Sequence, residues 1–375
     1  MHDVVIIGGG VIGLSLACEL AGEGASVAVC DQGQMGQESS WAGAGILPPG
    51  NPDRAESPEA RLRAASHVLW PQWSALLNEE TGIDNGFRRC GGLEVRQDGS
   101  PRALEEEIEA WRLEGVAVEP LTAHAAHERE PDLSPRFAAG YRLPEMGQVR
   151  NPRHLKALVA LAARRSVALF PVTPVYGFDR VGEKIVAVET PAGRIRAGQF
   201  VVASGAWSGR LLEEADCSAA VRPLRGQIVL LNAQPSRLSH VINVGARYLV
   251  PRGDGRVLVG ATEEDVGFDK RTTAAAVGGL MAFACELVPA LANAAVEKFW
   301  SGLRPLSADG LPYLGPVDSA LNLYAATGHF RAGLQLSCVT ARVMAQLLLG
   351  RKTTVPLGPY SPGRKRQKPE LAGTV

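Results

Sequence analysis

Three glycines near the start of the chain are the first residues whose spacing could do chemistry. Gly8-x-Gly10-x-x-Gly13 follows an apolar, β-branched run and precedes a helix-forming stretch. Gly8 permits a tight turn, Gly10 lets the backbone approach a pyrophosphate, and Gly13 lets the helix lie close to the strand. The helix N-terminus, which includes Val11 and Ile12, would then face the phosphates with free N–H groups.

An acidic residue stands where a dinucleotide site needs one. Asp31 ends the next apolar run and can bind ribose hydroxyls. A glycine-rich turn in an ordinary α/β domain would not need this acid, so the pattern predicts a dinucleotide site. The pattern does not distinguish an NAD site from an FAD site. An acidic residue in place of a basic one argues against NADP. The absence of a second such motif disfavours electron transfer from a nicotinamide to a flavin, and the N-terminal position in a long chain favours FAD.

The elements around this motif form a βαβ unit, with strands at 4–7 and 27–30 and a helix at 14–23. Ser57-Pro58-Glu59 opens a further helix, because it supplies a cap, a first-turn proline and an early acid. Other helices are expected at 102–114, 151–164, 273–287 and 333–349, and strands at 91–95, 184–189, 200–203, 228–231, 248–250, 257–259 and 323–325.

This order of elements predicts an α/β fold with two interleaved domains. One is a Rossmann-like FAD-binding domain, a parallel sheet with the N-terminal βαβ unit, and the other a substrate domain with a mixed or antiparallel sheet. The FAD-binding domain is expected from residues 1–85, 145–220 and 300–350, and the substrate domain from 86–144 and 221–299. Residues 351–375 are expected to be a tail, with Arg364-Lys365-Arg366 as a solvated end.

The composition argues against several classes of protein. The 39 Lys and Arg residues balance 39 Asp and Glu residues, so there is no basic surplus for nucleic acid or an anionic membrane. The six cysteines lack metal-ligand or redox-pair spacing, so no metal site is expected and the cysteines are interpreted as buried, free thiols. No apolar stretch reaches the roughly 18 residues of a membrane span, and signal-peptide features are missing, so a cytoplasmic location is expected.

Further segments, in order along the chain to about residue 350, carry a resemblance to a known family. They are residues 3–13, 39–47, 202–208, 260–265, 302–305 and 309–315, and Gly328-His329-Phe330-Arg331-x-Gly333. The chain resembles the D-amino-acid-oxidase-like FAD-dependent oxidoreductases, and among them most closely the glycine oxidases of thiamine biosynthesis. The resemblance implies non-covalent FAD, because sarcosine-oxidase relatives attach FAD through a cysteine and Leu306-Ser307-Ala308 offers none.

The resemblance implies which residues bind the cofactor. In that family the first loop lies against the pyrophosphate and flavin ring, the segment at 202–208 lies along the cofactor, and Val175 matches the residue that bonds the adenine. The last helix would point its N-terminus at flavin N1 and the C2 carbonyl, where its dipole stabilises reduced flavin. The alternative interpretation of Trp207 is an aromatic residue of the hydrophobic core that does not contact the cofactor. The implied contacts are Gly8, Gly10, Val11, Ile12, Gly13, Asp31, Ser39, Ser40, Ala44, Gly45, Leu47, Val175, Ser204, Gly205, Trp207, His329, Phe330, Arg331, Gly333 and Leu334.

The resemblance also implies catalytic residues around a small amino acid. Arg304 matches the arginine that binds the substrate carboxylate, Tyr248 matches a tyrosine that adds a hydroxyl, and Arg331 matches a second arginine near flavin and substrate. A structural ion pair and a core tyrosine are the alternatives. His329 is interpreted as a structural hydrogen-bonding residue and not as a base.

Two positions depart from the family pattern. Glu263 is charged where some glycine oxidases have an apolar residue; it could face water or pair with the substrate amine. Ala246 is smaller than the residue some relatives carry, so the pocket could admit more than glycine.

The predicted reaction is hydride transfer from the α-carbon of glycine, as the neutral amine, to flavin N5. The resulting imine is hydrolysed by water to glyoxylate and ammonia, and oxygen reoxidises the flavin to give hydrogen peroxide. Alternatives are an oxidase or dehydrogenase of sarcosine, N-substituted glycines or D-amino acids, and, from another class, a flavin-binding electron carrier without substrate. A homo-oligomer is expected from the relatives.

Overall fold

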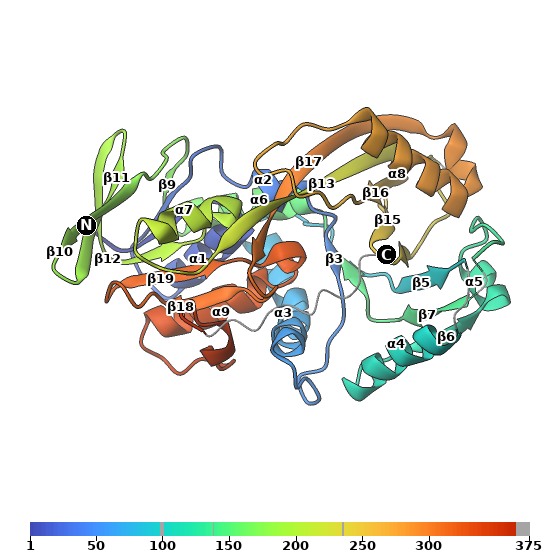
Figure 1. Ribbon diagram of the computed structural model, residues 1–375, viewed down its shortest axis with the longest axis horizontal. Coiled ribbons are helices and arrows are strands. Elements are labelled where there is room, and N and C mark those ends of the chain that lie inside the picture. Colours follow the sequence, from blue (N-terminus) through green and yellow to red (C-terminus); the bar gives the residue numbers. More distant parts are fainter. Residues whose placement is uncertain (98–100, 138, 235, 365–375) are drawn as a thin grey trace.

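Two large sheets organise the chain, one in each lobe of Figure 1. The computed structural model describes residues 1–97, 101–137, 139–234 and 236–364. Lys365 and Arg366, part of the predicted solvated end, lie outside these residues.

The first sheet is the Rossmann-like one. Its central strands β19, β12, β1, β2 and β9 run parallel, and β10, β11 and β18 extend it with antiparallel pairings. The strands are β1 (His2–Ile7), β2 (Val27–Cys30), β9 (Ala168–Phe170), β10 (Gly177–Val181), β11 (Lys184–Thr190), β12 (Gly193–Val202), β18 (Tyr313–Pro316) and β19 (Leu323–Thr327).

Helices cover this sheet because alternate residues of β1 face opposite sides. Val4 and Ile6 belong to a core that residues of four helices share, while Val5 and Ile7 belong to a separate core with β2, β12 and a short helix. The four helices are α1 (Val11–Gly22), α3 (Pro58–Thr81), α6 (Asn151–Arg164) and α9 (Ser337–Leu348), and the short one is α7 (Ser208–Glu213). The predicted βαβ unit and the predicted helix at 151–164 are confirmed.

The second sheet is mixed and forms the other lobe. All its neighbouring strands are antiparallel except β14 and β5, which are parallel. Helix α8 (Ala274–Leu287) covers one face, and α4 (Pro101–Leu113) lies near the other face. In spatial order the strands are β17 (Ala295–Ser307), β13 (Val221–Asn232), β16 (Arg256–Gly260), β15 (Arg247–Pro251), β14 (Val241–Val244), β5 (Gly92–Arg96), β7 (Ala139–Leu143) and β6 (Glu119–Thr122).

The remaining elements are short. A small third sheet has the order β3 (Ile46–Leu47), β8 (Gly147–Gln148) and β4 (Arg88–Arg89), and the short helices are α2 (Glu38–Ala42), α5 (Ala123–Arg129) and the 3₁₀ turns η1 (Gly205–Trp207), η2 (Pro289–Asn293), η3 (Phe330–Ala332) and η4 (Gly358–Tyr360).

The long strand β17 crosses a predicted domain boundary. Its pairing with β13 runs from Ala295 to Ser307, so residues 300–307 join the second sheet although they were expected in the FAD-binding domain. The exact domain limits stay a prediction.

Two local expectations were wrong. The last helix begins at Ser337 and not at about Gly333, because the chain first forms η3 and then a turn over residues 333–336. Arg364 is not solvated: its side chain is only 10% exposed, pairs with Asp309 and stacks on the Tyr313 ring.

Of the six cysteines, all free, Cys18, Cys30 and Cys338 are buried as expected, whereas the others are half-buried. Within the described ranges, no group of histidine, cysteine or acidic side chains could hold a metal ion. Nor does any described helix have the length and apolar character needed to cross a membrane.

Candidate active site

One cavity of about 590 Å³ runs from the carboxyl end of β1 to the second sheet. It brings together every predicted site residue except Gly13 and Leu47. Gly13 instead packs against the β1 turn, where an added Cβ would lie 1.9 Å from Gly8 O, in line with its predicted role. The Leu47 side chain is buried in the core, and Ile46 and Pro48 line the cavity in its place.

The glycine motif leaves the backbone open toward the cavity. Gly10 is the N-cap of α1 and has no side chain to satisfy the first turn, and the Val11 N–H donates to Ser40 Oγ at 3.0 Å. At Gly8, with φ of +119°, an added Cβ would lie 2.3 Å from Ala203 O. Backbone donors at a bare helix N-terminus are what a pyrophosphate requires, so this end fits a dinucleotide.

Asp31 lies at the expected end of β2. Its two oxygens each accept a backbone N–H at 2.7 Å, one from Gly9 and one from Gly33. Burial raises the pKa of Asp31, and these two hydrogen bonds oppose that rise. The carboxylate is therefore fixed in orientation, with lone pairs left for ribose hydroxyls.

The loop at 39–45 is held by a residue that sequence reasoning missed. Asn151, the first residue of α6, donates from Nδ2 to Ser40 O at 2.9 Å and lines the cavity. Gly45 has φ of +75°, and an added Cβ would lie 2.0 Å from Val149 O. The only signal in the sequence was an asparagine before a proline at a predicted helix start.

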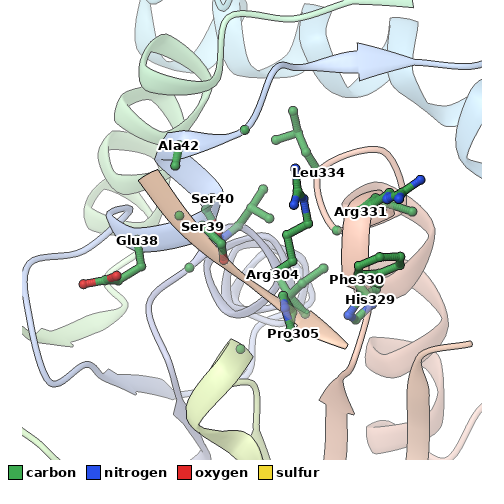
Figure 2. A pocket seen from close by; sticks show the side chains of 18 of the residues that line it. Glu38, Ser39, Ser40, Ala42, Arg304, Pro305, His329, Phe330, Arg331 and Leu334 are labelled. Carbon is green, nitrogen blue, oxygen red and sulfur yellow. The ribbon is translucent and has the colours of Figure 1, made fainter. Parts of the chain in front are cut away.

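The segments at 204–207 and 329–334 line the far part of the cavity. Figure 2 shows Arg304 between Ser39 and Ser40 on one side and the turn from His329 to Leu334 on the other. Because α9 begins only at Ser337, its dipole acts from one turn further away than predicted, and such effects fall off within a turn. Trp207 is not part of a core cluster; its ring centroid lies 5.6 Å from that of Phe268.

Arg304 and Tyr248 meet at the substrate end. Arg304 comes from β17 and donates from Nη1 to Thr262 O at 3.0 Å, and Tyr248 comes from β15 and hydrogen-bonds Arg304. Burial lowers the pKa of Arg304 and raises the pKa of Tyr248. A half-buried arginine whose hydrogen-bond acceptors are backbone carbonyls can take a carboxylate as its counterion.

Two glycines create the room for this pair. An added Cβ at Gly226 would lie 2.4 to 2.5 Å from the Arg304 guanidinium, and one at Gly260 would lie 2.5 Å from the Tyr248 ring. Gly226 therefore lets the Arg304 guanidinium lie close to β13, and Gly260 lets the Tyr248 ring lie close to β16. Sequence reasoning missed both, because they matter only once the strands are paired.

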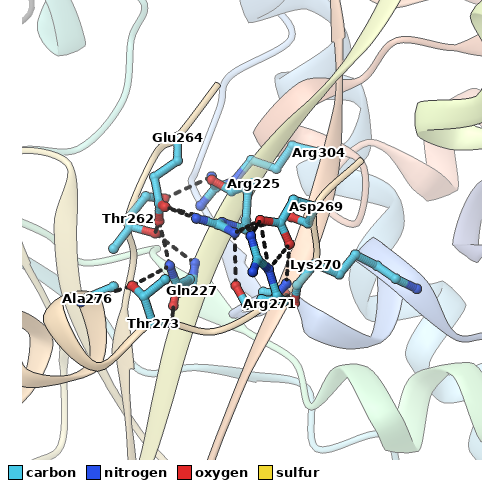
Figure 3. A network of polar contacts seen from close by, with 11 residues as sticks. Arg225, Gln227, Thr262, Glu264, Asp269, Lys270, Arg271, Thr273, Ala276 and Arg304 are labelled. Carbon is cyan, nitrogen blue, oxygen red and sulfur yellow. Dashed lines mark hydrogen bonds and ion pairs between the residues drawn. The ribbon is translucent and has the colours of Figure 1, made fainter. Parts of the chain in front are cut away.

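A buried polar network supports the backbone that holds Arg304 (Figure 3). Arg225, 5% exposed, forms an ion pair with Glu264 and donates to Arg271 O at 2.9 Å. Gln227 Nε2 donates to Glu264 Oε1 at 2.7 Å. The network fixes the loop after β16, whose Thr262 carbonyl accepts from Arg304.

His329 and Arg331 have different surroundings. His329 is buried, its Nε2 lies 3.0 Å from Thr340 Oγ1, and burial lowers its pKa to about 3. It is thus a neutral hydrogen-bonding residue, as expected. Arg331 is half exposed and pairs with Glu263, Nε to Oε2 at 2.9 Å. Glu263 therefore lines the cavity, but its charge is matched by an arginine.

The fold and the dinucleotide end of the cavity define an FAD-dependent oxidoreductase. The chain matches the model for FAD dependent oxidoreductases over residues 3–347, and it belongs to that family. Its residues fit FAD, from the glycine turn and Asp31 to the turn at 328–334.

Individual relatives of the chain are described more specifically than the family as a whole. The chain is 38% identical to the glycine oxidase of Pseudomonas putida over 364 residues, 96% of this chain and 98% of that protein. It is 34% identical to the bifunctional protein ThiO/ThiG of Nostoc sp., over 98% of this chain and 56% of that protein. The crystal structure of glycine oxidase from Geobacillus kaustophilus matches with a TM-score of 0.92 at 34% identity, over 98% of this chain and 99% of that one.

Proposed function

We propose that this chain is a glycine oxidase. It converts glycine, oxygen and water to glyoxylate, ammonia and hydrogen peroxide, and its product serves thiamine biosynthesis. The observation that carries the proposal is the meeting of Arg304 and Tyr248 in the flavin cavity. Relatives named glycine oxidase match nearly the whole length of the chain.

Arg304 and Tyr248 bind and orient the substrate. The guanidinium supplies parallel donors to the carboxylate, and the Tyr248 hydroxyl adds a third. Because both side chains are half-buried in the cavity wall, the interaction is partly shielded from solvent and holds the α-carbon in a fixed position. Bound FAD supplies the hydride acceptor and the electrons for oxygen.

No protein base is needed at the α-carbon. Glycine reacts as the neutral amine, whose lone pair assists departure of the hydrogen as hydride. His329 takes no part in proton transfer, since its Nε2 is held by Thr340 and its pKa is lowered to about 3 by burial. The chain thus contributes positioning and exclusion of water.

The test is anaerobic reduction of the purified flavoprotein by glycine, sarcosine and D-alanine. Glycine should bleach the visible flavin absorbance fastest, and aeration should restore it with hydrogen peroxide. Arg304→Lys should lower kcat/KM for glycine at least tenfold, because the bidentate fork is lost. Arg136→Lys, an exposed arginine that lines neither cavity, is the matched control. Faster reduction by sarcosine or D-alanine would show that this amine, and not glycine, is the preferred substrate. If none of the three amines reduced the flavin, the proposal would be overturned.

A further inference from the structure

A second, smaller chamber adjoins the substrate end. It has a volume of about 200 Å³, several times the roughly 30 Å³ that a water molecule occupies in the liquid. Pro48, Met146 and Asn243 line both this chamber and the main cavity, so the two are adjacent. Glycine, held by its carboxylate at Arg304, has no substituent that would enter this space.

A row of polar side chains leads from the substrate site into the chamber. Tyr248 pairs with Asn243 across β15 and β14, Asn243 pairs with Glu94 across β14 and β5, and Glu94 pairs with Tyr141 across β5 and β7. Residues in register on adjacent strands project to the same face of a sheet. Neighbouring strands lie about 4.8 Å apart, so Glu94 is roughly 10 Å from Tyr248 along this row.

The Tyr248 ring leaves this row open. It lies over Gly260 on the opposite side from Asn243, because an added Cβ at Gly260 would fall 2.5 Å from the ring. Ala246, which also lines the main cavity, is a small residue. A substituent can therefore extend past Tyr248 toward Asn243.

Glu94 sets the chemistry of the chamber. Its side chain is 13% exposed, and its Oε1 accepts from the Gly245 N–H at 3.0 Å and lies 3.5 Å from Arg96 Nη1. Both contacts use Oε1, so Oε2 is the oxygen left for a ligand. Burial raises the pKa of Glu94 to about 7, so the carboxyl is mostly ionised in an assay at about pH 8.

Arg63, the arginine that lines the chamber, does not neutralise the negative charge of Glu94. Arg63 is ion-paired with Glu114, and its guanidinium lies 4.8 Å from the Trp111 ring centroid. Its charge is already matched, and Glu59, which also lines the chamber but is mostly exposed, lies 4.0 Å from Arg63 Nη1. A hydrogen-bond donor, and best a cation, is the group that complements Glu94.

We propose that this enzyme accepts, besides glycine, substituted glycines or D-amino acids whose short arm ends in a hydrogen-bond donor, with Glu94 as the specificity-determining residue. This inference rests on the proposed function, since it uses the same carboxylate site and reaction. The arm passes Asn243 and its terminal ammonium or amide group binds Glu94 Oε2.

Two isosteric substrate pairs test the proposal. N-(2-aminoethyl)glycine is compared with N-propylglycine, and D-2,4-diaminobutyrate with D-norvaline, so each pair differs only in a terminal ammonium or methyl group. A charge-assisted hydrogen bond contributes about 1.5 to 3 kcal/mol, so at least one aminated member should have a kcat/KM at least about tenfold higher than its isostere. Which pair responds distinguishes an arm on nitrogen from an arm on the α-carbon.

Variants assign the preference to Glu94. Glu94→Gln, which keeps the shape, should reduce the ratio within the responding pair to about threefold or less. Glu286→Gln, an exposed glutamate on α8 that lines neither cavity, should keep the wild-type ratio. Equal rates within both wild-type pairs would overturn the inference without any variant, and so would a ratio that Glu94→Gln leaves intact.

Two further measurements separate the possible failures. Preferred oxidation of iminodiacetate over N-(2-aminoethyl)glycine would also overturn the inference, because a carboxylate arm would point to Arg63. Glycine is assayed with the same enzyme preparations. Normal glycine oxidation without amine discrimination refutes this inference alone, whereas absent glycine oxidation refutes the proposed function.

Discussion

Gly226 offers the sharpest test of the carboxylate site. The residue lies on β13, does not have positive φ, and so can become alanine without backbone strain. The new methyl group would fall 2.4 to 2.5 Å from three atoms of the Arg304 guanidinium, whereas ordinary contacts are 3.4 Å or longer. The guanidinium, the far end of a flexible side chain, must therefore move by about 1 Å.

A shift of that size at a substrate-positioning group can lower the rate about 100-fold. We expect Gly226→Ala to fold, load FAD, and lose about two orders of magnitude in kcat/KM for glycine, with a raised KM. The assay is peroxide release, with the visible spectrum as a check on flavin content. Gly278→Ala on α8, where an added Cβ meets nothing within 4 Å, is the control. A flavin-loaded Gly226→Ala enzyme within threefold of wild type would refute the reasoning.

Three other substitutions probe the surroundings. Glu264→Gln leaves buried Arg225 without its full counter-charge, so the unfolding free energy from urea titration should fall by about 3 kcal/mol and KM for glycine should rise; unchanged stability would contradict this. The pKa of His329 is lowered from 6.5 in the unfolded chain to about 3 in the folded protein, so the stability contributed by the neutral imidazole is present above pH 6.5 and is lost as pH falls. In the His329→Gln variant, the loss of stability between pH 6.5 and pH 5 should therefore be smaller than in the wild type by about 2 kcal/mol. Asp31→Asn should weaken FAD binding about tenfold or more, measured by titrating the apoprotein, and an unchanged affinity would exclude the ribose role.

Much of the cofactor end could be predicted because its signals are local. The turn at Gly8, the N-terminus of α1 and Asp31 lie within one βαβ unit, so their spacing along the chain fixes their spacing in space. The helix start at Ser57 was equally readable, and its Oγ accepts from the Ala60 N–H at 3.1 Å. The family resemblance then supplied Arg304 and Tyr248, which no local spacing connects.

The substrate end depends on pairing between distant strands. Gly226 faces Arg304 only because β13 and β17 pair in one register, and Asn243 lies between Tyr248 and Glu94 only because β14 pairs with β5. A change of one residue in register would turn these side chains to the other face. Arg364 was misjudged for a related reason: its partner Asp309 lies 55 residues earlier in the chain.

The two sheets therefore contribute different kinds of recognition. The Rossmann-like sheet presents mainly backbone groups and one carboxylate, which suits a cofactor of fixed shape. The second sheet presents side chains in register, with glycine at 226 and 260 making room for them. Because Glu263 is already paired with Arg331, its charge is a poor candidate for choosing among amines. Selectivity is better placed at Asn243 and Glu94, where a buried carboxyl adjoins open space beside the substrate carboxylate site.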